Sequence, residues 1–356
     1  MRKYWLILVS LLFIIWSCEK SPVDNPGDEN EDEFVTLPIS VKGEILSVTE
    51  MPMTRAGEVQ QVFYIEVFAS PTSDGQYTCY AFGIFSDLTK ASLKLNKSYT
   101  YFLRARCFRP VHDIIRVRPF YNQYDFETIL TNLCSYNEVT LNEFDYSGKK
   151  SFKVSNDNHE DPCVGVERKE NTSTTALGYA NDMDSFYSII SYFSPKNNNT
   201  ISFDMMRNTY GYRFEVDNLS SGYVVIELTK SSVQKIDHII LTPDNPVFES
   251  VARIRTYSDT GLKGVSKDYS YKVYKEYKEL GKDYTESPII LITYVDNENN
   301  STVVYSDDSI LFTRNKKKLF TIHLNNESGG ETENPLSMTF DKDMTVEGDP
   351  IIISQQ

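Results

Sequence analysis

Residues 62–69 read VFYIEVFA and residues 77–85 read YTCYAFGIF, with the turn-forming triplet Ser73-Asp74-Gly75 between them. Both segments are rich in Tyr, Phe, Val and Ile, the residues that fit the pleated, half-buried surface of a β-sheet. Small polar residues and glycine between two such segments favour a change of chain direction. These residues therefore predict two β-strands separated by a turn, and their pattern extends along the chain.

Hydrophobic residues elsewhere in the chain follow the same period of two, which predicts a mainly β protein. Turn-forming clusters separate the apolar segments, for example Ser220-Ser221-Gly222 and the Asp-Asn-Glu-Asn-Asn run at residues 296–300. The predicted strands cover residues 35–41, 62–69, 77–85, 99–107, 200–206, 212–216, 223–228, 289–295, 302–305, 318–324, 336–340 and 351–354.

Two stretches have helical spacing instead. The first is the apolar set Phe186, Ile189, Ile190 and Phe193, which falls at i, i+3, i+4 and i+7 behind the capping residue Asn181. It predicts a short helix over residues 182–192. The acids near its start, at 182 and 184, suit the positive end of a helix dipole. A weaker stripe of the same kind comprises Phe126, Ile129, Leu130 and Leu133.

The chain is 356 residues long, which suggests two domains of ordinary size. Pro195, Lys196 and three asparagines interrupt the strand pattern before a new series of strands begins at residue 200. We therefore predict two tandem β-sandwich domains, over residues 34–195 and 196–356, with one or two short helices.

The N-terminus carries the features of a lipoprotein signal peptide. A basic start precedes an apolar run of 13 residues that ends at Trp16, and Ser17 then stands directly before Cys18. The run is shorter than the ~20 residues that a spanning helix needs. We predict a signal peptide over residues 1–17, cleavage between Ser17 and Cys18, and acylation of Cys18, which would tether the protein to a membrane surface. The alternative is an ordinary secretory signal peptide in which Cys18 is incidental.

Residues 18–33 predict an acidic, disordered spacer. The segment has seven acidic residues against Lys20 and a single aliphatic side chain, Val23. It cannot bury enough apolar surface to offset the entropy of ordering. The formal net charge of the whole chain is −14, which argues against nucleic-acid binding because that needs concentrated positive charge. The basic run at Arg314 and 316–318 is interpreted as the solvated start of a strand.

The residues give little support for catalysis. The histidines stand in no metal-binding arrangement, and neither a GxSxG elbow nor a glycine-rich phosphate loop is present. The acids at 296 and 298 could bind calcium weakly or simply form an exposed turn. The histidines in question are His112, His159, His238 and His323. We predict no enzyme activity, no cofactor and no metal site.

Four cysteines follow Cys18. They are Cys79, Cys107, Cys134 and Cys163, and they are either buried thiols or include one disulfide.

Four motifs, in chain order, resemble those of the Bacteroidales-type fimbrillin family. They are MTRAG at 53–57 ahead of VFYIEVF at 62–68, KSYTYFLRA at 97–105, DMDSFY at 182–187 and ISFDMMR at 201–207. The resemblance covers most of the chain. It implies a pilus shaft, tip or anchor subunit built as two transthyretin-like β-sandwiches, located at the outer membrane or in a fimbrium, with other fimbrial subunits as partners.

The resemblance also implies assembly by exchange of strands. A sandwich that loses its first strand keeps an open groove, which an extended strand of another subunit can fill. Residues 35–41 would be the removable strand, and cleavage between Arg55 and Ala56 would release it. Ile351, Ile352 and Ile353 would be a donor strand, or else the last strand of their own domain. An uncut chain would remain anchored as the base of a fimbria.

Two other functions stay open at this point. A surface glycan-binding lipoprotein would suit the 24 tyrosines, although both tryptophans, Trp5 and Trp16, lie in the signal peptide. A hydrolase built on a β-sandwich is the third hypothesis, and no constellation of residues argues for it.

Overall fold

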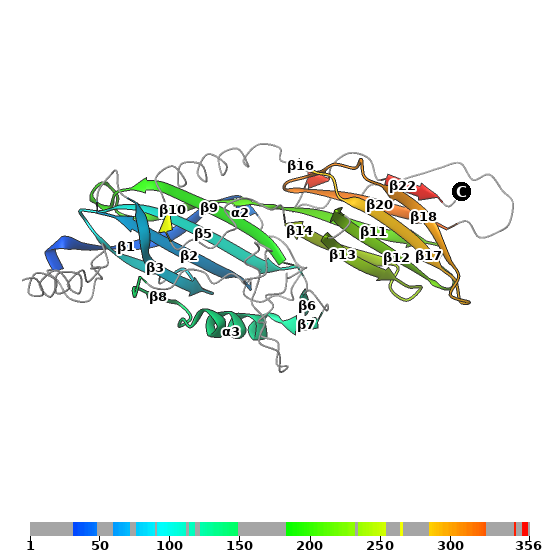
Figure 1. The fold of residues 1–356 in the computed structure, drawn as a ribbon, viewed down its shortest axis with the longest axis horizontal. Helices are drawn as coiled ribbons and strands as arrows, with labels where there is room; N and C mark the ends of the chain where they lie inside the picture. The colour runs from blue at the N-terminus through cyan, green and yellow to red at the C-terminus, as the bar shows by residue number, and fades with distance from the viewer. Residues whose placement is uncertain are drawn as a thin grey trace, which may run out of the picture.

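The structure is a computed structural model of the chain, and it describes residues 31–47, 60–71, 76–89, 91–111, 114–117, 122–148, 183–231, 234–253, 264–265, 285–324, 345–346 and 351–354. The described residues are mainly β, as the sequence predicts. Figure 1 shows two groups of strands that follow one another along the long axis of the molecule. No helix in these ranges is long and apolar enough to cross a membrane.

The first group of strands forms a nine-stranded sheet in the order β15-β3-β2-β5-β9-β10-β1-β4, with β8 pairing with β3. Its strands are β1 (Phe34–Gly43), β2 (Val62–Ser70), β3 (Tyr77–Phe85), β4 (Ser92–Asn96), β5 (Thr100–Pro110), β8 (Glu143–Asp145), β9 (Met183–Phe193), β10 (Ile201–Arg207) and β15 (Gly264–Val265). The short elements beside it are the 3-10 helix η1 (Glu31–Glu33), α2 (Glu44–Ser47), the hairpin of β6 (Ile114–Val117) and β7 (Asn122–Asp125), and α3 (Phe126–Asn137).

The larger hydrophobic core lies on the inner face of this sheet. It is lined from the central strands and closed by apolar residues of the strands at the end of the sheet order, β10, β1 and β4. Its buried members include Ile65, Val67, Leu103, Leu37, Ile39, Leu93, Ile201 and Phe203. The strands β2 and β5 are also buried on their outer face, which explains why their apolar character is nearly continuous.

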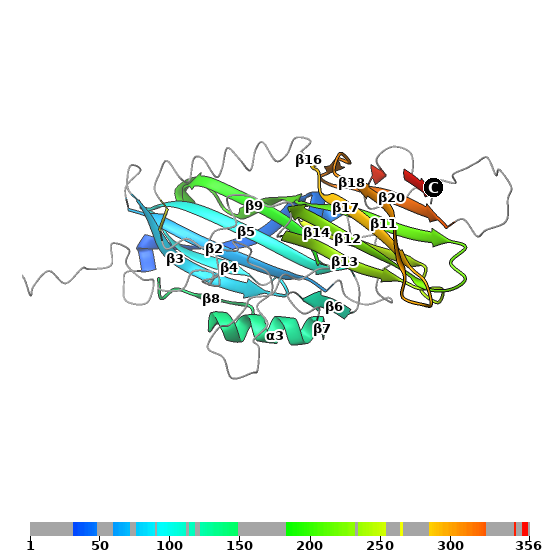
Figure 2. The same ribbon diagram turned by 45° about the vertical axis from the view of Figure 1, so that its right-hand side comes forward.

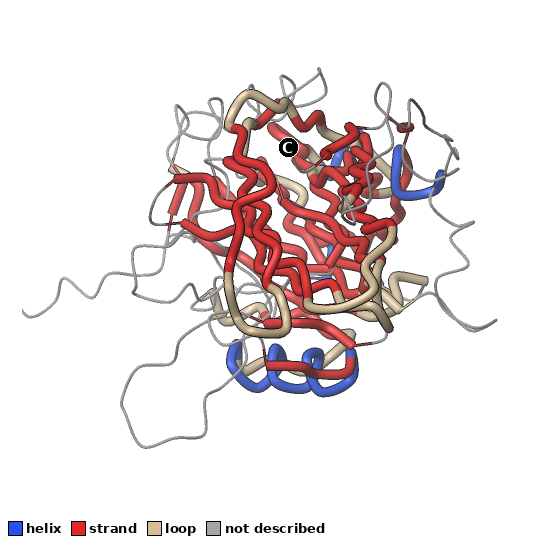
Figure 3. Tube along the Cα trace, turned by 90° about the vertical axis from the view of Figure 1, so that its right-hand side faces the viewer, coloured by secondary structure: helices blue, strands red, loops and turns tan. Residues whose placement is uncertain are grey.

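Helix α3 covers part of that outer face and confirms the weaker of the two predicted helical stripes. Phe126, Ile129, Leu130 and Leu133 are all buried and pack on residues of β2, β3 and β5. Asp125 caps the helix, since its carboxylate accepts a hydrogen bond from the backbone N–H of Thr128 at 2.7 Å. Figures 2 and 3 show α3 lying outside the layers of strands.

The predicted helix over residues 182–192 is wrong, because this segment is the strand β9. It pairs with β5 along most of its length and with β10 at its start. Every residue from Met183 to Ile189 is buried, so both faces of the strand carry buried side chains. A strand that is buried on both faces loses its period of two, and apolar residues at helical spacing then arise by coincidence.

The second group of strands contains two sheets that enclose one core, together with a short two-stranded pair. The sheet orders are β14-β11-β20-β21, with β22 also paired to β20, and β13-β12-β17-β18. The strands are β11 (Thr209–Asp217), β12 (Tyr223–Ser231), β13 (Gln234–Leu241), β14 (Val247–Arg253), β16 (Thr285–Glu286), β17 (Ile289–Val295), β18 (Ser301–Asp307), β19 (Phe312–Thr313), β20 (Lys316–His323), β21 (Thr345–Val346) and β22 (Ile351–Ser354). Phe214 of β11 stacks on Phe320 of β20 near the centre of this core, with ring centroids 4.5 Å apart.

The two cores meet in a short stretch of chain. Met205 of β10 is the last residue of the first core, and Tyr210 of β11 is the first residue of the second. The sequence-based boundary at 195/196 falls between β9 and β10, which both belong to the first sheet. Of the predicted strands, only that at residues 336–340 lies outside the described residues. The longer strands that the sequence does not predict are β4, β9, β13 and β14, and the short strands β6, β7, β8, β15, β16, β19 and β21 are not predicted either.

Candidate functional site

The first strand, β1, is held by different partners along its two halves. Residues 34–38 pair antiparallel with β4, and residues 39–43 pair in parallel with β10. Pro38 stands at the change of partner, where a residue without a backbone N–H is tolerated. Each half of β1 therefore contributes its ladder hydrogen bonds to one neighbour only.

The side chains of β1 alternate between core and solvent. Leu37 and Ile39 are buried in the first core, and Val35 and Val41 are half-buried against it. Phe34 is buried outside this core, and Nζ of Lys94 lies 5.0 Å from the centre of its ring. The intervening positions from Thr36 to Lys42 are largely exposed. The strand thus fills an apolar groove in the first core with one face and presents a polar face to solvent.

Gly43 ends β1 and turns the chain into α2. Its φ of 88° lies in the left-handed region, and a Cβ at this position would come within 2.9 Å of the carbonyl oxygen of Met205. The close approach of β1 to β10 therefore requires glycine here. The turn places the next residue, Glu44, beside the junction between the two cores.

We expect Gly43→Ala to lower the free energy of unfolding by about 1–3 kcal/mol, because the new methyl group meets backbone atoms in a strained conformation. Urea unfolding of the purified protein measures this change. The neighbouring substitution Lys42→Ala is the control, since Lys42 is exposed and its loss should change stability by less than about 0.5 kcal/mol. Equal stability of the two variants would contradict the assigned role of Gly43.

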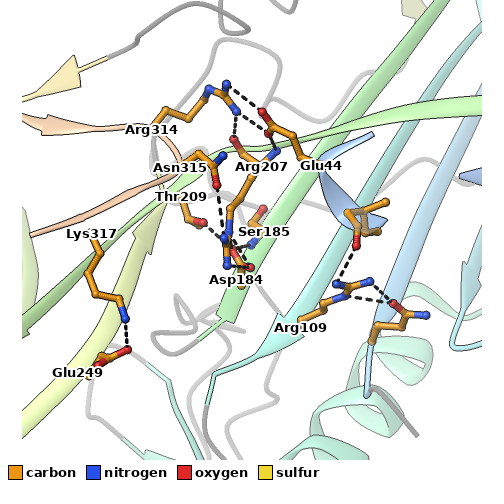
Figure 4. A network of polar contacts seen from close by, with 12 residues as sticks. Glu44, Arg109, Asp184, Ser185, Arg207, Thr209, Glu249, Arg314, Asn315 and Lys317 are labelled. Carbon is orange, nitrogen blue, oxygen red and sulfur yellow. Dashed lines mark hydrogen bonds and ion pairs between the residues drawn. The ribbon is translucent and has the colours of Figure 1, made fainter. Parts of the chain in front are cut away.

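A buried ion pair lies at the junction between the cores. Arg207, the last residue of β10, has no exposed side-chain surface, and its Nε and Nη2 atoms donate to the two oxygens of Asp184 on β9 at 2.6–3.0 Å. Asp184 Oδ1 also accepts from the hydroxyl of Thr209 at 2.5 Å and from the backbone N–H of Ser185 at 2.9 Å. All these interactions are shown in Figure 4.

A second ion pair joins the residue after β1 to the second group of strands. Arg314, in the turn between β19 and β20, donates to both carboxylate oxygens of Glu44, at 2.7 and 3.2 Å. The Glu44 carboxylate also accepts a hydrogen bond from the backbone N–H of Arg207 at 2.7 Å. Arg314 donates a further hydrogen bond to the backbone carbonyl of Arg207 at 2.8 Å. The side chain of Arg314 is only 10 % exposed.

We call the set Glu44, Asp184, Arg207, Thr209, Arg314 and Asn315 the joint network. Asn315 completes it: its backbone N–H donates to the carbonyl of Thr209 at 2.8 Å. The network brings together residues from both cores and from the turn that follows β1 (Figure 4). It therefore ties the end of the first strand to both groups of strands.

The sequence did not predict this network. Asp184 was interpreted as a residue near a helix start and Arg314 as part of a solvated basic run, and both interpretations are wrong because the two side chains are buried and paired. Lys317 of the same run is also buried and pairs with Glu249 of β14 at 2.6 Å. A usable signal was present: Arg207 continues the inward-facing series of residues 201, 203 and 205, so a buried partner was required.

The C-terminal strand β22 pairs in parallel with β20 of its own chain, with Ile351 opposite Phe320 and Ile353 opposite Ile322. The other predicted site residues, Ser17, Cys18, Arg55 and Ala56, lie outside the described residues.

Three cysteines lie in the described ranges, and all three are thiols: Cys79, Cys107 and Cys134. Burial raises the pKa of Cys107 to about 12 and, with help from the charge of Glu66, raises that of Cys79 to about 12. Such thiols are protonated at neutral pH and chemically inert. The described residues hold no group of three His, Cys, Asp or Glu side chains that could bind a metal ion.

No family model matches the chain, and no curated protein matches it either. Its structural neighbours are candidate adhesins of Bacteroides and fimbrial proteins of Porphyromonas. A candidate cell adhesion protein from Bacteroides uniformis is 11 % identical with a TM-score of 0.33, covering 82 % of this chain and 94 % of that one. The tip fimbrial protein Mfa3 from Porphyromonas gingivalis, with a C-terminal truncation, is 10 % identical with a TM-score of 0.27 over 76 % and 81 %. The fimbrial anchor protein Mfa2 from the same organism is 9 % identical with a TM-score of 0.27 over 78 % and 82 %.

Proposed function

We propose that this chain is a fimbrillin-type lipoprotein of the cell surface: a structural subunit or the anchor of a fimbria, assembled by exchange of its first strand. The observation that carries the proposal is the geometry of β1. This strand fills a core groove with Leu37 and Ile39, flanked by Val35 and Val41, yet pairs with β4 along one half and with β10 along the other. A strand of this kind can leave as one piece and be replaced by another of the same pattern.

The energetics suit a long-lived but exchangeable contact. Leu37 and Ile39 each contribute roughly 1.5–3 kcal/mol through removal from water, and the half-buried Val35 and Val41 contribute less. Its ladder hydrogen bonds add about 0.5–1.5 kcal/mol each. An empty groove would leave unpaired backbone groups on β4 and β10 as well as exposed apolar surface. A replacement strand would therefore be bound strongly, even after the entropic cost of association.

The strand β22 has the pattern of a candidate donor. The half of β1 that pairs with β10 begins Ile39-Ser40-Val41 and follows Pro38, and the C-terminal strand begins Ile351-Ile352-Ile353 and follows Pro350. In both, a proline precedes alternate β-branched aliphatic residues. Both strands also pair in parallel with their neighbour, β1 with β10 and β22 with β20. The same chain segment could therefore pair in parallel with β10 of another subunit.

The N-terminal features complete the proposal. The signal peptide and acylated Cys18 would bring the chain to the outer membrane, with residues 18–33 as spacer. Cleavage between Arg55 and Ala56 would release β1 together with the lipid and give a polymerising subunit. Without cleavage the protein would remain an anchor. In this proposal the two cores belong to two transthyretin-like β-sandwich domains that meet at residues 206–209.

N-terminal sequencing and intact-mass measurement of the protein from its own cell envelope test this function. We expect either a chain that begins at acylated Cys18 or one that begins at Ala56. Arg55→Ala should convert the second form entirely into the first, with Arg104, which is buried in the first sheet, remaining uncut. A mature chain that begins elsewhere, without lipid and without loss of β1, would overturn the proposal.

A further inference from the structure

The joint network has balanced charge only while Glu44 is present. It contains two guanidinium groups, of Arg207 and Arg314, and two carboxylates, of Asp184 and Glu44. Arg207 and Arg314 are 0 % and 10 % exposed, so little water can replace a lost counter-charge. A buried cation that loses its carboxylate is strongly destabilising.

Asp184 cannot serve both arginines. Its oxygens already accept hydrogen bonds from Arg207, from the hydroxyl of Thr209 and from the backbone of Ser185. Arg314 depends on Glu44 for its carboxylate contacts, and among the described residues its Nε atom is buried without a hydrogen-bond partner. The guanidinium of Arg314 thus has donor capacity beyond what Glu44 uses.

Glu44 belongs to the part of the chain that strand exchange would remove. It follows β1 directly and precedes Arg55, so cleavage at Arg55 would separate it from the folded chain together with the strand. Arg314 and the backbone N–H of Arg207 would remain behind, both pointing to the place that the Glu44 carboxylate had occupied (Figure 4). Together they form a receptor for one carboxylate at the end of the groove.

We propose that Arg314 selects the strand that fills the β1 groove by binding a carboxylate five residues after the position of Ile39. The inference rests on the proposed strand exchange and adds a rule of specificity to it. The partner is an extended segment of another subunit, with apolar residues at the positions of Leu37 and Ile39 and an acidic residue at that of Glu44. A segment such as β22, placed with Ile351 at the position of Ile39, would bring Gln356 to that of Glu44 and would lack this contact. Glu44 is the internal occupant of the receptor until exchange takes place.

Exchange of labelled strand peptides tests the rule. The full chain is given a specific protease site within residues 52–57, cut, and incubated with a fluorescent peptide of residues 32–46 that competes with the resident strand. We expect the Glu44→Gln peptide to bind about tenfold to a hundredfold more weakly, because a charge-assisted, two-point contact becomes neutral. The Glu33→Gln peptide is the matched control, since Glu33 is exposed at the opposite end of β1.

The outcomes separate this inference from the function on which it rests. Failure of every peptide to exchange would overturn strand exchange itself. Exchange with equal affinity of the native and Glu44→Gln peptides would overturn only the role of Arg314. Arg314→Gln in the protein should abolish the discrimination between the two peptides. Should that variant fail to fold, hydrogen exchange of the uncut Glu44→Gln chain provides the second measurement: β1 amides should exchange about tenfold faster than in Glu33→Gln, and equal rates would overturn the proposal.

Discussion

Replacing Asp184 by asparagine is expected to lower the free energy of unfolding by about 3–5 kcal/mol, because it leaves the guanidinium of Arg207 buried without a counter-charge. Arg207 has no exposed side-chain surface, and each hydrogen bond it makes to Asp184 is charge-assisted. Asparagine keeps the shape of the side chain but carries no charge, so the substitution isolates the electrostatic loss from any cavity. Urea unfolding followed by fluorescence measures the change.

The chain provides a matched control for this experiment. Arg213 and Glu215 form the same kind of pair at 3.1 Å, but their side chains are 38 % and 41 % exposed. Exposed pairs are screened by solvent, so Glu215→Gln should cost no more than about 1 kcal/mol. The double variant Asp184→Asn, Arg207→Met should recover part of the lost stability, since it removes the stranded charge. A loss below 1 kcal/mol for Asp184→Asn alone would show that the pair does not hold the junction.

The strands were largely predictable because the sequence carries their signal locally. Segments such as residues 62–69 and 77–85 combine aromatic and β-branched residues with turn formers at their ends, and both form strands. The short strand β4 was missed although Leu93 and Leu95 alternate into the core, because five residues give the pattern too little length. The strand β9 was missed because burial on both faces removed its alternation.

The joint network could not be predicted by the same reasoning because its partners are far apart in sequence. Asp184 and Arg207 are 23 positions apart, and Glu44 and Arg314 are 270 apart. Periodicity shows which face of a strand is buried, but not which distant charge lies opposite. Arg207 on the buried face of β10 indicated that a carboxylate must exist. Only the topology, which places β9 beside β10 and the β19–β20 turn beside α2, identifies which one it is.

Locking β1 to β4 with a disulfide is expected to abolish assembly into filaments while leaving the fold intact. Thr36 of β1 lies opposite Lys94 of β4. The backbone N–H of Lys94 donates to the hydroxyl of Tyr146 at 3.0 Å, and its carbonyl accepts from Tyr80 at 2.9 Å, so neither group is directed at Thr36. The two residues therefore form a non-hydrogen-bonded pair, whose Cα atoms lie about 4.5 Å apart, within the ~4.4–6.8 Å range that a disulfide spans.

The double variant Thr36→Cys, Lys94→Cys should retain its strand after cleavage at Arg55 and form no filaments until a reductant is added. The inert, buried thiol of Cys107 should not interfere with the new bond. Thr293→Cys, Val303→Cys is the control, because that pair joins β17 to β18 in a sheet that exchange does not disturb. Electron microscopy and gel mobility under oxidising and reducing conditions give the readout. The contrary result would be an oxidised Thr36→Cys, Lys94→Cys variant that forms as many filaments as the control variant. That result would contradict strand exchange, because assembly would then proceed with β1 in place and through another surface.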